Sequence, residues 1–257
     1  MSPPIPQHRV ALSVLGPPTF GGLALYDWDP ADLSASPVDS WTSKSSQLTL
    51  TAAGSARPEW LDAGGAQSLA FPCVHWDGVD DVMVSAGSQA LDWSDFTCFI
   101  VKERITTATN EGPYYHKGDG ASATQGRIET LAAAAGAQMY WTTNRAAPGT
   151  LGYFLMNDAA LQTTDAVVWS ARLDDTLLAT SDPDACRQNE VNVTNSKSGS
   201  VGALDDVDIV EHGHGYNAAK WNAYEYRRLY YTGGKLTDAQ TQEVEDYLRN
   251  TYFGGAY

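Results

Sequence analysis

Two acidic residues late in the chain offer carboxylates of the kind that could act on sugars. Residues 206–211 read DVDIVE, with Asp206 at one end and Glu211 at the other. Retaining glycosidases hold a nucleophilic carboxylate and an acid/base carboxyl group about 5 Å apart. Short motifs often match by chance, so we favour a strand followed by a polar loop. Glycoside hydrolysis by Asp206 and Glu211 is kept as the less favoured alternative.

The next residues offer nitrogen ligands for a metal ion. His212 and His214 are two positions apart, so on an extended strand both imidazoles would point the same way, with Glu211 beside them. The glycines at 213 and 215 favour a loop, and no third ligand is identifiable. We therefore treat these histidines only as weak metal candidates.

A second weak metal candidate is the acidic group Asp77, Asp80 and Asp81. Calcium prefers several oxygen ligands, which three neighbouring carboxylates can supply. The full calcium-loop pattern is absent, and aspartates are common in tight turns because their side chains accept backbone hydrogen bonds. We favour the turn interpretation, and calcium remains the weaker one.

Aromatic residues offer a platform for a sugar ring. The sequence holds 8 Trp and 13 Tyr, and two aromatic groups stand out: Tyr114 and Tyr115, then Tyr140 and Trp141. A ligand site typically combines such rings with a few polar groups. Half-buried strands also use Tyr and Trp, so we place a core or interface role first and a glycan-binding role second.

The charge balance excludes two classes of partner. There are 16 basic and 31 acidic residues, which gives a net charge of −15. Nucleic acid and anionic membrane surfaces both require basic patches, so we expect neither as a partner. No nucleophile elbow, phosphate loop or dinucleotide-binding pattern occurs, and we predict a protein that is not an enzyme and needs no cofactor.

Three cysteines and the N-terminal sequence indicate the cellular compartment in which the chain folds. Cys73, Cys98 and Cys186 match no metal-binding spacing, and their odd number leaves no complete set of disulfides. The N-terminus lacks a charged region followed by a continuous apolar run, so we predict no signal peptide. No stretch reaches the roughly 20 apolar residues of a membrane-spanning helix. We expect folding in a reducing cytoplasm.

Most of the chain predicts strands. Short apolar runs such as 96–101, 167–171 and 229–231 are separated by Gly, Asn and Asp, which is typical of a β-sandwich or barrel. The segment CVHWDGVDDVMV, residues 73–84, predicts a hairpin around Asp77-Gly78. Residues 131–138, LAAAAGAQ, are compatible with a short helix interrupted by Gly136.

One amphipathic helix is predicted over residues 238–251, at the end of the chain. Thr237 and Gln240 form a capping box, and Gly254 supplies a C-terminal stop. At the other end, residues 1–22 are rich in Pro and Gly and predict an arm preceding a single domain, 23–257.

Three segments in this order carry a resemblance. LALYDWDPADLS leads to VDSWTSKS, LAFPCVHWDGVDDVMV follows, and YEYRRLYYTGGKLTDAQTQEVEDYLRNTYF closes the chain. Together they resemble the concanavalin A-like, laminin-G-like jelly-roll domains of tailed-phage virion proteins and bacterial surface proteins. The resemblance implies an all-β, two-sheet antiparallel jelly-roll sandwich with a C-terminal helix. It implies that Trp41 and Trp76 are buried. Family-16 glycosidases share this fold but carry Glu where this chain has Asp206.

The resemblance implies a structural role without catalysis. We expect a phage virion protein, attached to the capsid as a decoration or to the tail, that folds in the host cytoplasm and then lies on the virion surface. The 1–22 arm would bind other virion proteins or copies of the same chain. The acidic body would project outward, where a second role in adhesion to glycans is left open. The alternative from another class is a carbohydrate-binding, lectin-like module.

Overall fold

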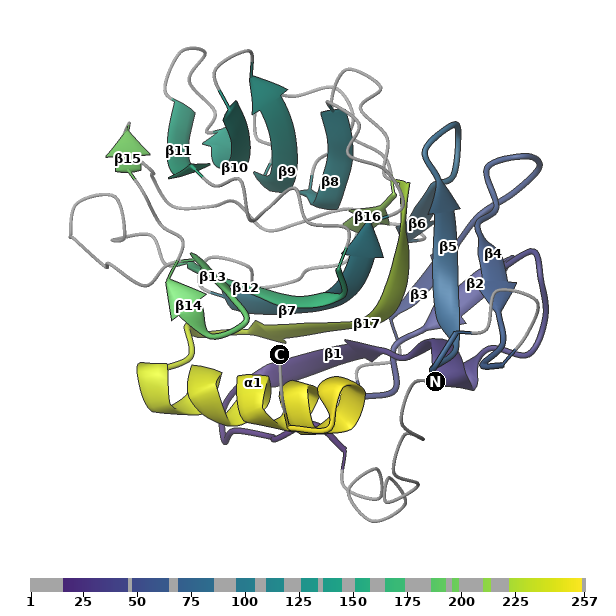
Figure 1. Cartoon of the computed structure of the whole chain (residues 1–257), viewed down its shortest axis with the longest axis horizontal. Coiled ribbons are helices and arrows are strands. Elements are labelled where there is room, and N and C mark those ends of the chain that lie inside the picture. Colours follow the sequence, from purple (N-terminus) through teal and green to yellow (C-terminus); the bar gives the residue numbers. More distant parts are fainter. Residues whose placement is uncertain are drawn as a thin grey trace, which may run out of the picture.

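The computed structural model describes residues 16–45, 48–64, 69–85, 96–104, 110–117, 126–133, 136–144, 151–157, 165–173, 186–192, 196–198, 210–213 and 222–255. Within these ranges the chain forms two antiparallel β-sheets, one short 3-10 helix, η1 (Pro30–Asp32), and one α-helix, α1 (Asp238–Phe253). This is the predicted all-β, two-sheet sandwich with a C-terminal helix. Figure 1 shows α1 in yellow beside β1 and β17.

Sheet A carries the helix. Its described strands run in the order β14 (Val191–Asn192), β13 (Cys186–Gln188), β12 (Val167–Leu173), β7 (Phe96–Arg104), β17 (Asn222–Thr232), β5 (Cys73–Asp77) and β4 (Glu59–Leu61), and β1 (Ala24–Trp28) also pairs with β17. The 11-residue strand β17 pairs with β7 along one edge, while its other edge pairs first with β5 and then with β1. Strand β17 is therefore the centre of the sheet.

Sheet B lies on the other side of sheet A from the helix. Its described strands run in the order β15 (Ser196–Ser198), β11 (Leu151–Asn157), β10 (Gly136–Asn144), β9 (Gly126–Ala133), β8 (Asn110–Lys117), β16 (Val210–His212), β6 (Met83–Ser85), β3 (Thr49–Thr51) and β2 (Ser40–Thr42). Strands β8 to β11 form the teal group at the top of Figure 1.

Alternating residues of sheet A build two separate cores. Ile100, Trp169 and Tyr230 face sheet B, where they join a buried cluster that contains Trp41 and Trp76. The exposed fractions of those two tryptophan side chains are 1% and 0%, which confirms the predicted burial. The neighbouring residues in the strands, Phe99, Val101, Val168, Leu229 and Tyr231, face the helix and join Val244 and Leu248. Because both faces of sheet A are covered, its central strand β17 buries side chains in both directions, including the charged Glu225 and Arg228.

Helix α1 begins at the predicted Asp238 and ends at Phe253, two residues beyond the predicted end and directly before Gly254. The Thr237 side chain accepts a hydrogen bond from the Gln240 backbone, the Gln240 side chain accepts one from the Thr237 backbone, and Gly254 adopts a left-handed conformation with φ 63°. Val244 and Leu248 are fully buried against sheet A. Capping fixes the two ends of the helix, and the apolar stripe fixes the face that packs on the sheet.

Two local predictions are wrong. Residues 73–84 do not form a hairpin, because β5 pairs with β4 and β17 in sheet A while β6 pairs with β3 and β16 in sheet B. The turn between them crosses from one sheet to the other. Residues 131–138 are not helical in their described part, because β9 and β10 pair through Ala133 and Gly136. Cross-strand pairing has outweighed the helical preference of the alanines.

The described part of the predicted arm lies against the domain. The Phe20 ring is 5.6 Å from the Tyr231 ring, and the Tyr231 hydroxyl donates a hydrogen bond of 2.8 Å to the Pro18 carbonyl. Residues 1–15 lie outside the described residues, so the arm and its boundary at residue 23 stay predictions. Among the described helices, none has the length and apolar character needed to cross a membrane.

Candidate functional site

The structure brings the three aspartates of the acidic turn together. One carboxylate oxygen from each of Asp77, Asp80 and Asp81 lies within 4.8 Å of the others. Asp77 Oδ1 accepts hydrogen bonds from the backbone of Val79 (2.6 Å) and Asp80 (3.3 Å), and Asp81 Oδ2 accepts one from Asp77 (2.7 Å). Burial raises the pKa of Asp81 to about 6. These bonds stabilise the crossing between the two sheets, and calcium binding stays a prediction.

The structure describes one of the two candidate histidines. His212 ends β16 and is fully buried, with its ring 5.0 Å from the Trp28 ring and 6.0 Å from the Tyr230 ring. Burial and the nearby Arg228 lower the pKa of His212, so its imidazole is neutral. A neutral ring enclosed by aromatic residues is part of the core. His214 lies outside the described residues.

The other sequence candidates are placed by their backbones alone. Tyr114 and Tyr115 lie in β8, and Tyr140 and Trp141 lie in β10. Strand β9 separates these two strands, and its Ile128 pairs with both Tyr115 and Trp141.

The structure describes one residue of the acidic pair. Glu211 lies in β16, while Asp206 lies outside the described residues. The pairing of these two carboxylates therefore stays the less favoured hypothesis.

A pocket of about 320 Å³ lies between sheet A and the last turn of α1. Its described lining comes from five separate segments and consists of Leu69, Ala70, Phe71, Val101, Glu103, Ala166, Tyr226, Tyr252 and Phe253. The volume lies at the lower end of the range for small-molecule sites, roughly 300–1,000 Å³. The lining is mostly aromatic and apolar, and Glu103 is its one charged residue among those described.

A bulge in β17 places Tyr226 in this pocket. Glu225 pairs with Lys102 and Arg227 pairs with Val101, so Tyr226 is an extra residue opposite β7. The Tyr226 ring centroid lies 6.4 Å from that of Tyr252 in α1, and the Arg227 guanidinium lies 5.6 Å from the centroid of the Tyr247 ring. Two consecutive side chains therefore lie on the helix side of the strand. Bulges commonly redirect side chains in this way beside binding sites.

Hydrogen bonds hold the polar groups of the pocket in position. The Tyr226 hydroxyl donates a bond of 2.6 Å to Glu103 Oε2, and the Tyr252 hydroxyl donates one of 3.1 Å to the Tyr226 carbonyl. Burial, followed by the bond to Glu103, raises the pKa of Tyr226, so the phenol stays a neutral donor. The Phe71 ring meets the Tyr252 ring edge to face at 5.0 Å. The result is a carboxylate held in a fixed orientation among aromatic rings.

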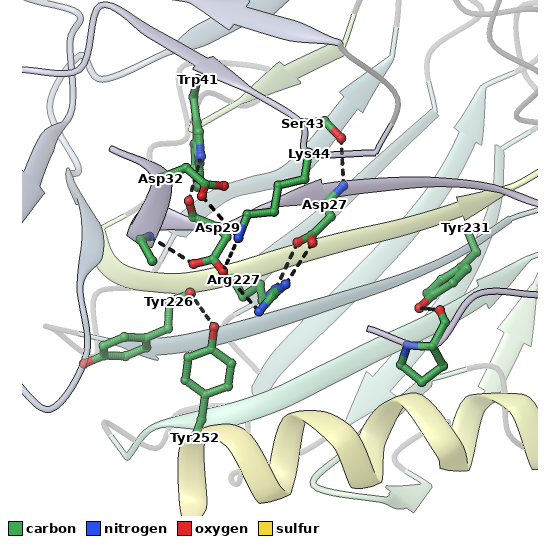
Figure 2. Close-up of polar contacts among 12 residues, drawn as sticks. Asp27, Asp29, Asp32, Trp41, Ser43, Lys44, Tyr226, Arg227, Tyr231 and Tyr252 are labelled. Atoms are coloured by element: carbon green, nitrogen blue, oxygen red, sulfur yellow. Dashed lines mark hydrogen bonds and ion pairs between the residues drawn. The ribbon is translucent and has the colours of Figure 1, made fainter. Parts of the chain in front are cut away.

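A charged cluster behind the pocket holds the bulge in place. Arg227 donates two hydrogen bonds to Asp27, of 2.9 and 2.8 Å, and forms an ion pair with Asp29 at 3.2 Å. Lys44 also pairs with Asp29, at 2.9 Å. Figure 2 shows the Arg227 side chain between the two aspartates, with the Tyr252 hydroxyl directed at the Tyr226 backbone. The guanidinium of Arg227 thus binds two carboxylates.

Sequence reasoning missed this pocket. Its aromatic residues belong to patterns that indicated a strand and a helix, and Glu103 follows the apolar run 96–101 without any motif. The available signal was the unusual density of tyrosines in residues 224–231. That signal indicates a half-buried surface but does not identify the segments that meet there.

Comparisons with known proteins give structural matches alone. No family model matches the chain, and no curated protein sequence matches it. The botulinum neurotoxin type G receptor-binding domain superimposes with a TM-score of 0.55 and 8% identity, over 88% of this chain and 51% of that chain. An arabinofuranosidase complexed with arabinofuranosyl-α-1,2-xylobiose gives 0.53 and 10%, over 89% and 59%. The Trypanosoma rangeli sialidase in complex with the inhibitor DANA gives 0.50 and 10%, over 92% and 34%.

These matches establish the fold. The chain spans between 34% and 59% of the three proteins, and at 8–10% identity the likeness concerns the β-sandwich alone. Two of the three are carbohydrate-active proteins. The matches give no support to the predicted virion role.

Proposed function

We propose that this chain is a carbohydrate-binding β-sandwich without catalytic activity, and that it binds a sugar in the pocket between sheet A and α1. The observation that carries the proposal is the combination of aromatic rings with a single oriented carboxylate, Glu103. Sugar rings offer apolar C–H faces and many hydroxyl donors. Half-buried aromatic rings bind such faces, and a fixed carboxylate accepts hydrogen bonds from hydroxyl groups.

The fold comparisons support a carbohydrate ligand more than a virion role. The similar arabinofuranosidase was complexed with arabinofuranosyl-α-1,2-xylobiose, and the similar sialidase was in complex with the inhibitor DANA. The lectin-like alternative from the sequence is therefore placed first. Attachment to a particle through residues 1–22 is a separate question, which a deletion can test.

The pocket favours binding over hydrolysis. A retaining glycosidase needs two carboxyl groups about 5 Å apart, and an inverting one needs two that are about 6.5–9.5 Å apart. Among the described residues that line the pocket, Glu103 is alone in having a carboxylate. We therefore expect the purified chain to release no reducing sugar from arabinan, xylan, laminarin or agar.

Isothermal titration with arabino-, xylo- and gluco-oligosaccharides tests the proposal. Phe253→Ala removes a ring from the pocket and is expected to weaken binding at least tenfold, about 1.4 kcal/mol. Phe20→Ala is the matched control, because Phe20 is also a partly buried ring packed on the helix-side core but does not line the pocket. Binding of none of these oligosaccharides nor of a glucosamine oligomer, or equal loss in both variants, would refute the proposal.

A further inference from the structure

We infer that the sugar bound in this pocket carries a free amino group. This inference rests on the proposed function and specifies its ligand class. The amine would lie against the carboxylate of Glu103, while the sugar ring packs on the surrounding aromatic side chains.

The pocket has the composition of a cation site. Glu103 is the one charged residue of the described lining, and aromatic rings accompany it from three segments: Phe71, Tyr226, and the pair Tyr252 and Phe253. Ammonium groups are attracted both to carboxylates and to the faces of aromatic rings. A neutral sugar would pack on the aromatic rings without an ion pair to Glu103, whereas a protonated amino sugar would make both contacts.

The hydrogen bonding of Glu103 leaves a place for the amine. Its Oε2 atom accepts the Tyr226 hydroxyl at 2.6 Å, which fixes the carboxylate plane. An ionised carboxylate has about four acceptor positions, so Glu103 can accept further N–H donors. Arg227, on the helix side of the neighbouring strand β17, binds Asp27 and Asp29 instead.

The charge of the whole chain favours the same ligand class. A net charge of −15 repels sugars that carry carboxylate or sulfate groups and attracts cationic ones. A polymer of amino sugars would be drawn to this surface before any unit enters the pocket. The net charge of the chain and the carboxylate of Glu103 therefore both favour a cationic sugar.

The experiment compares three oligosaccharides of equal length by isothermal titration: a glucosamine oligomer, its fully N-acetylated counterpart and a neutral xylo-oligosaccharide. The glucosamine oligomer is expected to bind at least tenfold more tightly than the other two, and added salt is expected to reduce this difference. Glu103→Gln keeps the shape and an acceptor for Tyr226 but removes the charge, so it should abolish the preference.

A matched control separates the pocket from the overall charge. Glu59→Gln removes the same unit of charge from an exposed glutamate of β4, which pairs with His75 at 3.3 Å and lies outside the pocket lining. It should keep the preference for the amine. Circular dichroism and thermal melting of each variant verify that it is folded.

The outcomes distinguish the inference from the proposed function. Equal binding of all three oligosaccharides, with loss in Phe253→Ala, would overturn the amine inference and leave carbohydrate binding intact. An amine preference that persists in Glu103→Gln would also overturn it. Binding of none of the oligosaccharides would overturn both.

Discussion

The ion pair between Glu225 and Arg228 allows a sharp test of how the interior is held together. Both side chains are 0% exposed, and they are joined by two hydrogen bonds of 2.7 and 2.6 Å. Glu225 also accepts a bond of 3.0 Å from the Trp76 indole. The perturbation is a double-mutant cycle of Glu225→Leu and Arg228→Met, which replaces charged side chains with apolar ones of similar size.

The expected magnitudes follow from the burial. Removing one partner leaves an uncompensated charge in the core, which costs about 3–5 kcal/mol. The double variant removes both charges, and its main remaining cost is the lost acceptor of the Trp76 N–H, about 1–3 kcal/mol. The double variant is therefore expected to be more stable than either single variant. For a chain of this size, a loss of 3–5 kcal/mol lowers the melting temperature by roughly 6–20 °C.

Urea denaturation followed by tryptophan fluorescence gives the four free energies of unfolding. Arg57→Met is the surface control, because Arg57 and Asp39 form an ion pair of 2.8 Å with side chains 34% and 73% exposed. That variant is expected to lose at most about 1 kcal/mol. If the effects of the two core substitutions simply add, the pair is not the coupled buried unit that its geometry indicates.

Three further predictions concern pH, packing and the N-terminal arm. Burial raises the pKa of Asp81 to about 6 and of Glu245 to about 7. Their contribution to stability is fully present below the unfolded values of about 4 and is lost as the pH rises through 6 and 7, so urea midpoints should increase from pH 8 to pH 5.5; a decrease would contradict the burial. Trp41→Ala should cost about 3–5 kcal/mol in the same denaturation assay, and a loss below about 1 kcal/mol would refute its place in the core. Deleting residues 2–15 should leave the melting temperature unchanged and reduce any self-association measured by light scattering, whereas deleting 2–22 should also destabilise the domain; unchanged association would show that the arm does not bind a partner.

The parts of the fold that the sequence predicted correctly depend on local signals. The capping box at Thr237 and the left-handed Gly254 each involve a few neighbouring residues, so the ends of α1 could be read directly. The apolar runs that become β7, β12 and β17 are also local. The burial of Trp41 and Trp76 followed instead from a resemblance that spans most of the chain.

The incorrect predictions required knowledge of which strands pair. Asp77-Gly78 resembles a hairpin turn, but β5 and β6 pair with distant strands in different sheets. The alanines of residues 131–133 favour a helix in isolation, and their pairing with β10 outweighs this preference. Short-range patterns do not contain these long-range partners.

A prediction of the pocket would have required contacts between residues that are far apart in the sequence. Its polar contact joins Glu103 to Tyr226, which are 123 positions apart in the chain. The bulge that makes this contact is defined by the register between β7 and β17, and no single residue type marks it. Candidate residues chosen from sequence motifs therefore did not include the lining of the pocket.

The bulge also links helix α1 to the candidate binding site. Tyr226 and Arg227 both face α1, where Tyr252 bonds to the backbone of Tyr226 and Tyr247 lies 5.6 Å below the Arg227 guanidinium. Without the helix, this face of sheet A would expose a row of apolar side chains and a group of buried charges to water. With the helix in place, Arg227 binds the carboxylates of the charged cluster and Tyr226 lines the pocket. The last turn of α1 is therefore both the cover of the sheet and one wall of the candidate binding site.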